Sequence, residues 1–79
     1  MRILDEISNN SLDNITIYLT SAEAKELRDS IDDLLKKPLN NHAHISDESF
    51  KKEITICIYN VNNLNGFNER SLDLIINDK

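Results

Sequence analysis

The sequence predicts an α+β protein built as a two-layer sandwich, in which an antiparallel sheet of three to four strands is covered by a central amphipathic helix and a C-terminal helix. Three observations lead to this prediction. Apolar residues recur with helical spacing between residues 20 and 37, apolar and polar residues alternate at residues 15–19 and 53–60, and the single Gly and single Pro imply short loops. Because each such element has one apolar face, a helix lying on a sheet is the arrangement that buries both.

The central helix has a marked start and a marked end. Thr20 and Glu23 have the spacing of a capping box, in which two backbone N–H groups of the first turn are satisfied. Pro38 cannot continue the helix and disfavours helical geometry at Lys37. We expect a polar loop over residues 39–42 to follow. One apolar stripe runs along the helix and should cover the sheet: Ala24, Leu27, Ile31, Leu34 and Leu35.

Two alternating segments supply the expected apolar face of the sheet. Residues 15–19 place three apolar side chains on one face, and residues 53–60 do the same in a β-branched and aromatic run. A further strand is expected from about Ala43 to Ser46, with a turn at residues 47–49. Residues 1–8 fit a helix or an extended segment, and we favour the extended one. The core-facing residues of the two main strands are Ile15, Ile17, Leu19, Ile54, Ile56 and Ile58.

The C-terminal tail, residues 67–79, admits two interpretations. A helix would use Phe67, Leu74 and Ile75, whereas a strand would use Leu72, Leu74 and Ile76. We favour the helix. Gly66, the only glycine in the sequence, precedes it and can adopt a positive φ. The sequence predicts one domain over residues 1–79, since so short a chain has no room for two cores.

Composition and charge narrow the classes of function. Fourteen acidic residues against nine basic ones give a net charge of −5, which disfavours nucleic-acid binding because phosphates are repelled. No apolar run approaches the length of a membrane span, and the N-terminus lacks the pattern of a signal peptide. Cys57 is the only cysteine, so an intramolecular disulfide and a multi-cysteine zinc site are excluded. We expect a cytoplasmic protein that contacts neither nucleic acid nor membrane.

One cluster contains residue types that can bind a metal. His42 and His44 are two residues apart and therefore project from the same face of a strand, while Asp47 or Glu48 could fold back as a third ligand. Zn or Ni would suit such a set. The alternative is that no cofactor binds and the histidines face solvent, where they protect an edge strand from unwanted pairing.

Catalytic motifs are missing from the sequence. There is no Gly-rich phosphate loop and no nucleophile elbow, and Ile45 stands where an H-x-[ST] motif would need a hydroxyl. Cys57 alternates with isoleucines and is expected to be an inert packed residue. The sequence therefore predicts that the protein is not an enzyme.

Two surfaces are candidates for protein binding. Asp29, Asp32 and Asp33 lie on the outer helix face, which is either a solvated surface of i,i+4 pairs or a docking surface for a basic partner. Tyr18 and Tyr59 fall opposite the isoleucines of their strands. They could pair the sheet with a second copy or with a partner, or could face water.

The order of segments also carries a resemblance. ITIYLT runs into EAKEL, and the His42/His44 loop, EITICIY and NLNGF follow. This order resembles small bacterial α+β proteins, some of which are immunity or antidote proteins paired with toxins, and the likeness covers Ile15 to about Ile75. It implies a stoichiometric binding role and transfers no catalytic residue. The leading hypothesis is therefore a non-enzymatic interaction module that pairs with itself as a homodimer, with a protein partner, or with both. The partner form is an acidic inhibitor that covers the basic cleft of a toxin or nuclease. The alternative is a small metal- or ligand-binding module that uses His42 and His44.

Overall fold

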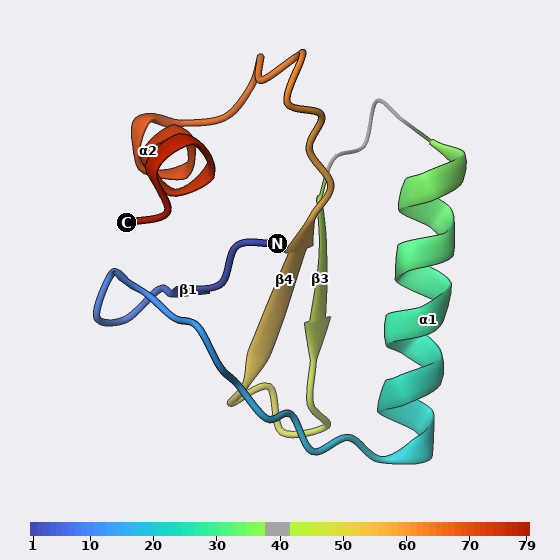
Figure 1. Ribbon diagram of the computed structural model, residues 1–79. Coiled ribbons are helices and arrows are strands. Elements are labelled where there is room, and N and C mark those ends of the chain that lie inside the picture. Colours follow the sequence, from blue (N-terminus) through green and yellow to red (C-terminus); the bar gives the residue numbers. More distant parts are fainter. Residues whose placement is uncertain (38–41) are drawn as a thin grey trace. The chain divides into compact units, whose positions relative to one another are not determined.

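The computed structural model describes residues 1–37 and 42–79 and confirms the α+β class (Figure 1). The chain divides into two compact units, one formed by residues 1–17 with 61–79 and the other by residues 18–60. Within the described residues, no helix is long and apolar enough to cross a membrane. The elements in chain order are β1 (Leu4–Asp5), β2 (Asn10–Ser11), α1 (Ser21–Lys36), β3 (His42–Ser46), β4 (Glu53–Cys57) and α2 (Glu69–Asn77).

Helix α1 begins as its sequence predicts. The Thr20 hydroxyl accepts a hydrogen bond from the Glu23 N–H at 3.2 Å, and the Glu23 carboxylate accepts one from the Thr20 N–H at 2.9 Å, so the capping box is complete. At the other end, the Lys37 N–H donates to the Asp33 carbonyl. Pro38 and residues 39–41 of the predicted polar loop lie outside the described residues. His42, which was expected to end that loop, is instead the first residue of β3.

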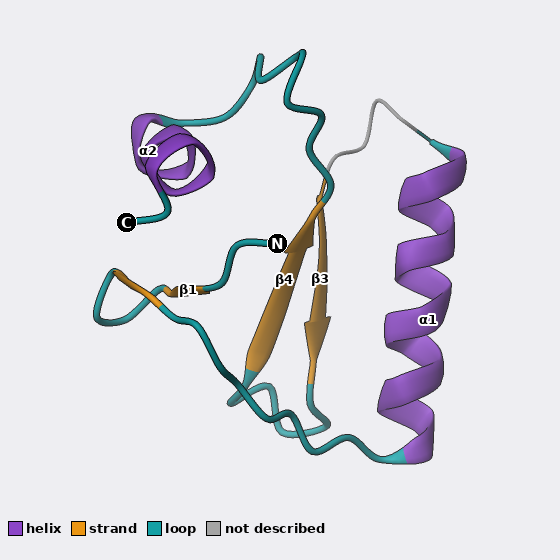
Figure 2. Ribbon diagram, in the orientation of Figure 1, coloured by secondary structure: helices purple, strands orange, loops and turns teal. Residues whose placement is uncertain are grey.

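Strands β3 and β4 form an antiparallel hairpin (Figure 2). The residues on its two faces differ in character. Ile45 is directly opposite Ile54, and Ala43 is opposite Ile56, so these four apolar residues share one face. Helix α1 packs against β3, and the buried residues of this unit are Leu34 on α1 and Ile45 on β3, exposed by 5% and 3%. The strand predicted over residues 53–60 is β4, which ends at Cys57, three residues earlier than expected.

The expected strand at residues 15–19 was wrong. These residues are extended but belong to no strand, and Ile15, Ile17 and Leu19 each keep a third to a half of their surface exposed. Alternation shows that a segment suits a sheet, but a strand also needs a neighbour with which to exchange hydrogen bonds. The described residues therefore form two two-stranded sheets, β1–β2 and β3–β4, rather than one sheet of three to four strands.

The first unit contains β1, β2 and α2. Asn68 caps α2 by accepting from the Ser71 N–H at 2.8 Å, and Asp78 ends the helix in the left-handed conformation, donating its N–H to the Leu74 carbonyl. The C-terminal tail is therefore a helix, as favoured, and Leu74 is its buried residue. Gly66 has a φ of 91°, which confirms its expected role in the preceding turn.

Candidate functional site

The apolar stripe of α1 divides into a buried part and an exposed part. On α1, which packs against β3, Leu34 is buried and Leu27 is half-buried. The other three residues of the stripe are displaced from Leu27 and Leu34 by about 70° around the helix axis, since successive residues are rotated by about 100°. Ile31 is 37% exposed and Leu35 is 67% exposed, and Ala24 is exposed as well. We call these three residues, Ala24, Ile31 and Leu35, the apolar flank of α1.

The stripe was expected to be covered along its whole width, and that expectation was wrong for the apolar flank. A stripe of five residues is about 100° wide. A two-stranded hairpin presents a narrow surface, and α1 contacts its β3 strand. The sheet therefore covers one side of the stripe and leaves the other accessible.

Charged side chains border the apolar flank on its solvent side. The Arg28 guanidinium contacts the Asp29 carboxylate at 3.1 Å, and the Lys36 ammonium contacts the Asp32 carboxylate at 2.7 Å. Hydrogen bonding and attraction from Asp32 raise the pKa of Lys36 above its ordinary value. Asp33, the third predicted acidic contact residue, is also exposed on α1. Such exposed pairs contribute little to stability, so they leave these side chains able to reorganise around a partner.

The two tyrosines do not share the sheet surface that the sequence predicts. Tyr18 is 91% exposed and lies in the extended segment before α1, while Tyr59 is half-buried and follows the end of β4. Neither residue belongs to a strand of the described chain. Tyr18 has the exposure that a contact residue needs, and it belongs to the same compact unit as the apolar flank.

The face of the β3–β4 hairpin opposite the isoleucines carries the histidines. His42 and His44 have ring centroids 5.4 Å apart, with an angle of 76° between the ring planes. The Nδ1 atom of His44 lies 2.9 Å from the Thr55 hydroxyl and 2.6 Å from a Glu53 carboxylate oxygen. The strand register explains these contacts, since Thr55 is opposite His44 and Glu53 is its diagonal neighbour. The predicted pair is therefore brought together, with a carboxylate beside it.

Asp47, the third predicted ligand, is engaged in the turn between β3 and β4. Its carboxylate accepts hydrogen bonds from the N–H groups of Lys51 and Lys52 at 2.9 and 3.2 Å and from the Ser49 hydroxyl at 3.0 Å. These contacts, led by the Lys52 N–H, lower the pKa of Asp47. No group of three His, Cys, Asp or Glu residues placed to hold a metal ion occurs within residues 1–37 and 42–79.

Sequence reasoning missed the neighbours of the histidines across the hairpin. It treated Cys57 as a packed strand residue, but Cys57 is exposed and is directly opposite His42. It also gave no role to Glu53 or Thr55. Aligning the two predicted strands as a hairpin across the 47–49 turn would have placed all three residues on the histidine face, because strand side chains alternate.

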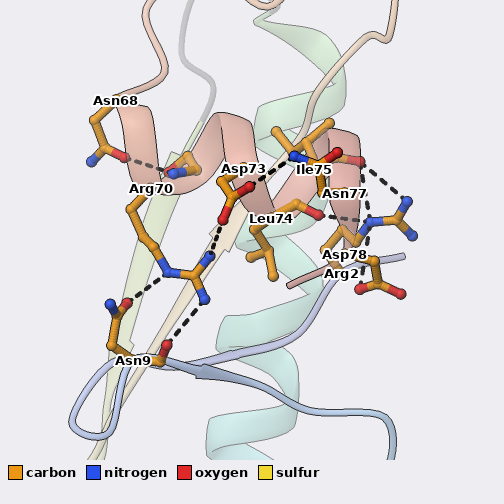
Figure 3. Close-up of polar contacts among 10 residues, drawn as sticks. Arg2, Asn9, Asn68, Arg70, Asp73, Leu74, Ile75, Asn77 and Asp78 are labelled. Atoms are coloured by element: carbon orange, nitrogen blue, oxygen red, sulfur yellow. Dashed lines mark hydrogen bonds and ion pairs between the residues drawn. The ribbon is translucent and has the colours of Figure 1, made fainter.

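The first unit has a separate polar cluster, shown in Figure 3, that also escaped prediction. The Arg2 side chain donates hydrogen bonds to the carbonyls of Leu74 and Ile75 at 3.0 to 3.3 Å, at the C-terminal end of α2. The Arg70 side chain donates to the side chain and carbonyl of Asn9 at 2.7 and 3.0 Å. These contacts join the N-terminal hairpin to α2 and satisfy helix carbonyls, so their role is structural.

The chain was compared with protein-family models, with curated proteins and with solved structures. No family model matches it, and neither does a curated protein or a solved structure. The function proposed below therefore depends on the geometry of α1 and of the β3–β4 hairpin.

Proposed function

We propose that the protein is a non-enzymatic interaction module that acts by stoichiometric binding to another protein, and that the apolar flank of α1 is its contact surface. The observation that carries the proposal is the exposure of Leu35 and Ile31, one helical turn apart on a well-capped helix. Fully burying an aliphatic side chain stabilises by about 1.5–3 kcal/mol. A partner that covers the flank would gain part of this free energy at each residue.

The surroundings of the apolar flank resemble the usual organisation of a protein interface, in which an apolar centre is bordered by charged groups. Here the border consists of the Arg28–Asp29 and Asp32–Lys36 pairs. A helix also holds these side chains in fixed relative positions, which reduces the entropy lost on binding.

Charge favours a partner with a basic surface. The chain has a net charge of −5, and Asp29, Asp32 and Asp33 are exposed on α1. Opposite charges accelerate encounter and disfavour acidic partners. An acidic inhibitor that covers a basic cleft is the form of the proposal that this charge supports. Tyr18 would add an aromatic contact, a residue type enriched at interfaces.

Retention of a partner by matched variants tests the proposal. Leu35→Lys places a charge in the apolar flank, and Val61→Lys makes the same charge change at a residue of similar exposure, 71%, outside it. Tagged chains are isolated from their native cells after brief cross-linking, and bound proteins are quantified by mass spectrometry. We expect the parent chain and Val61→Lys to retain one protein at a fixed ratio. The amount of this protein retained by Leu35→Lys should be lower by at least about tenfold.

Two results would contradict the proposed function. Equal retention by both lysine variants would show that the apolar flank does not contact the partner. Absence of any protein retained at a fixed ratio by the parent chain would refute stoichiometric binding itself. The melting temperature of Leu35→Lys serves as the control, since a side chain already 67% exposed should tolerate the change without unfolding.

A further inference from the structure

We infer that His42 and His44 together bind one divalent transition-metal cation of the Zn, Ni or Cu class, and that the same two residues of a second copy complete its coordination. The metal would thus bridge two chains through four imidazole nitrogens. This site lies on the β3–β4 hairpin and does not depend on the apolar flank of α1.

The spacing of the two rings fits chelation. The ring centroids of His42 and His44 are 5.4 Å apart. In a tetrahedral site with metal–nitrogen distances of about 2.0–2.1 Å, two imidazole rings that point at the metal have centroids about 5.2 Å apart. The ring separation that β3 sets is therefore close to the one that chelation requires.

Glu53 supplies a feature that often accompanies metal-binding histidines. Its carboxylate oxygen lies 2.6 Å from Nδ1 of His44, and the Thr55 hydroxyl lies 2.9 Å from the same atom. A carboxylate in this position favours the proton on Nδ1, which leaves the lone pair on Nε2 available to a metal. It also fixes the orientation of the ring. Metal binding at Nε2 would leave the contact with Glu53 intact.

The exposure of the pair indicates where the remaining ligands come from. His42 is exposed, as is His44, and both project from the hairpin face opposite the isoleucines. A tetrahedral cation held by two nitrogens has two coordination positions left, and the exposure of both histidines leaves them accessible to a second copy. A two-fold axis through the metal would place the same two nitrogens of a second copy at those positions. The dication would also offset repulsion between two chains that each carry −5.

Sedimentation velocity of the full chain with and without zinc sulfate tests this inference, with the bound metal measured after buffer exchange. We expect a metal-dependent dimer that contains one zinc per two chains and returns to monomer with EDTA. His42→Ala and His44→Ala should each abolish the dimer. Glu53→Gln should weaken zinc affinity about 10- to 100-fold, the usual effect of losing a ligand's carboxylate partner. If an alanine variant fails to fold, the corresponding glutamine variant replaces it.

Two further variants separate this site from its alternatives. Cys57→Ser should leave zinc-dependent dimerisation unchanged, although Cys57 is directly opposite His42. Leu35→Lys should also retain it, which distinguishes failure of this inference from failure of the proposed interaction role. One zinc per monomer, zinc binding lost in Cys57→Ser, or no saturable binding would each overturn the inference.

Discussion

The two helices are held by different kinds of contact. Helix α1 packs on β3 through apolar side chains, with Leu34 and Ile45 buried. Helix α2 has Leu74 buried, but it is also held by Arg2 and Arg70, which bond to backbone and side-chain oxygens far away in sequence. The apolar face of α1 follows from local periodicity. The arginine contacts instead join residues that are far apart in the sequence, by 72 positions for Arg2 and Leu74 and by 61 for Arg70 and Asn9. The sequence therefore predicts which face of α1 is apolar, but it predicts neither Ile45 as the residue buried against that face nor the arginine contacts.

The largest effect is expected at the centre of the apolar contact. Ile45→Ala should lower the free energy of unfolding by about 2–5 kcal/mol, because Ile45 is almost fully buried. Ile31 belongs to the stripe that the sequence predicts to cover the sheet, but it is 37% exposed, so Ile31→Ala should cost less than about 1.5 kcal/mol. Urea denaturation of both variants measures the difference. Equal losses would show that α1 does not pack through Leu34 and Ile45.

The arginine contacts should contribute less, but measurably. Arg2→Gln removes hydrogen bonds from a charged, partly buried group to two carbonyls of α2, and we expect a loss of about 1–3 kcal/mol. Arg28→Gln is the matched control, because Arg28 forms an exposed surface pair with Asp29 and should cost at most about 1 kcal/mol. Hydrogen exchange should accelerate in the last turn of α2 in Arg2→Gln. Unchanged protection there would mean that Arg2 does not secure the helix end.

A backbone effect of the opposite sign is expected in the β3–β4 turn. Phe50 has a φ of 55° and an exposed side chain, so it holds a left-handed conformation without the benefit of burial. Phe50→Gly should raise the free energy of unfolding by about 0.5–1 kcal/mol, since glycine adopts this conformation without the steric cost. Thermal unfolding measures the gain, and a lower midpoint would indicate that the Phe50 ring makes a stabilising contact.

The smallest effect on stability is expected from the aspartate carboxylates in the two hairpin turns. Hydrogen bonds lower the pKa of Asp47, chiefly from the Lys52 N–H, and that of Asp5, chiefly from the Ser8 hydroxyl. A lowered folded-state pKa gives stability that is present above the ordinary value of 3.8 and is lost as the pH falls through the folded value. Asp47→Asn should therefore unfold at lower urea concentration than the parent at pH 7, and the gap should narrow below about pH 4. A gap independent of pH would exclude the carboxylate charge as the cause.

Several elements could be predicted because their signals are local. The capping box of α1, the β3 and β4 alternation and the positive φ of Gly66 each depend on residues near in sequence. The prediction of a strand at residues 15–19 was wrong because an alternating pattern does not show which neighbouring strand would pair with it. The prediction that the sheet covers Leu35 was wrong for a similar reason, since the width of the covering sheet is a tertiary property.

The histidine cluster was predictable in part. The H-x-H spacing placed His42 and His44 on one face, as the structure has them, with their rings in contact. The role of Asp47 was misjudged, because a carboxylate at the start of a tight turn finds backbone N–H donors close by in sequence. Glu53 could be found only once the register of the hairpin was known.

Photo-cross-linking from α1 is the most direct test of the proposed interaction role. A benzophenone side chain placed at position 35, in the apolar flank, is compared with the same group at position 61, an equally exposed aliphatic site. The account predicts an adduct with one protein of defined mass from position 35 and little or none from position 61. Equal yields from the two positions, or no adduct from position 35, would contradict it.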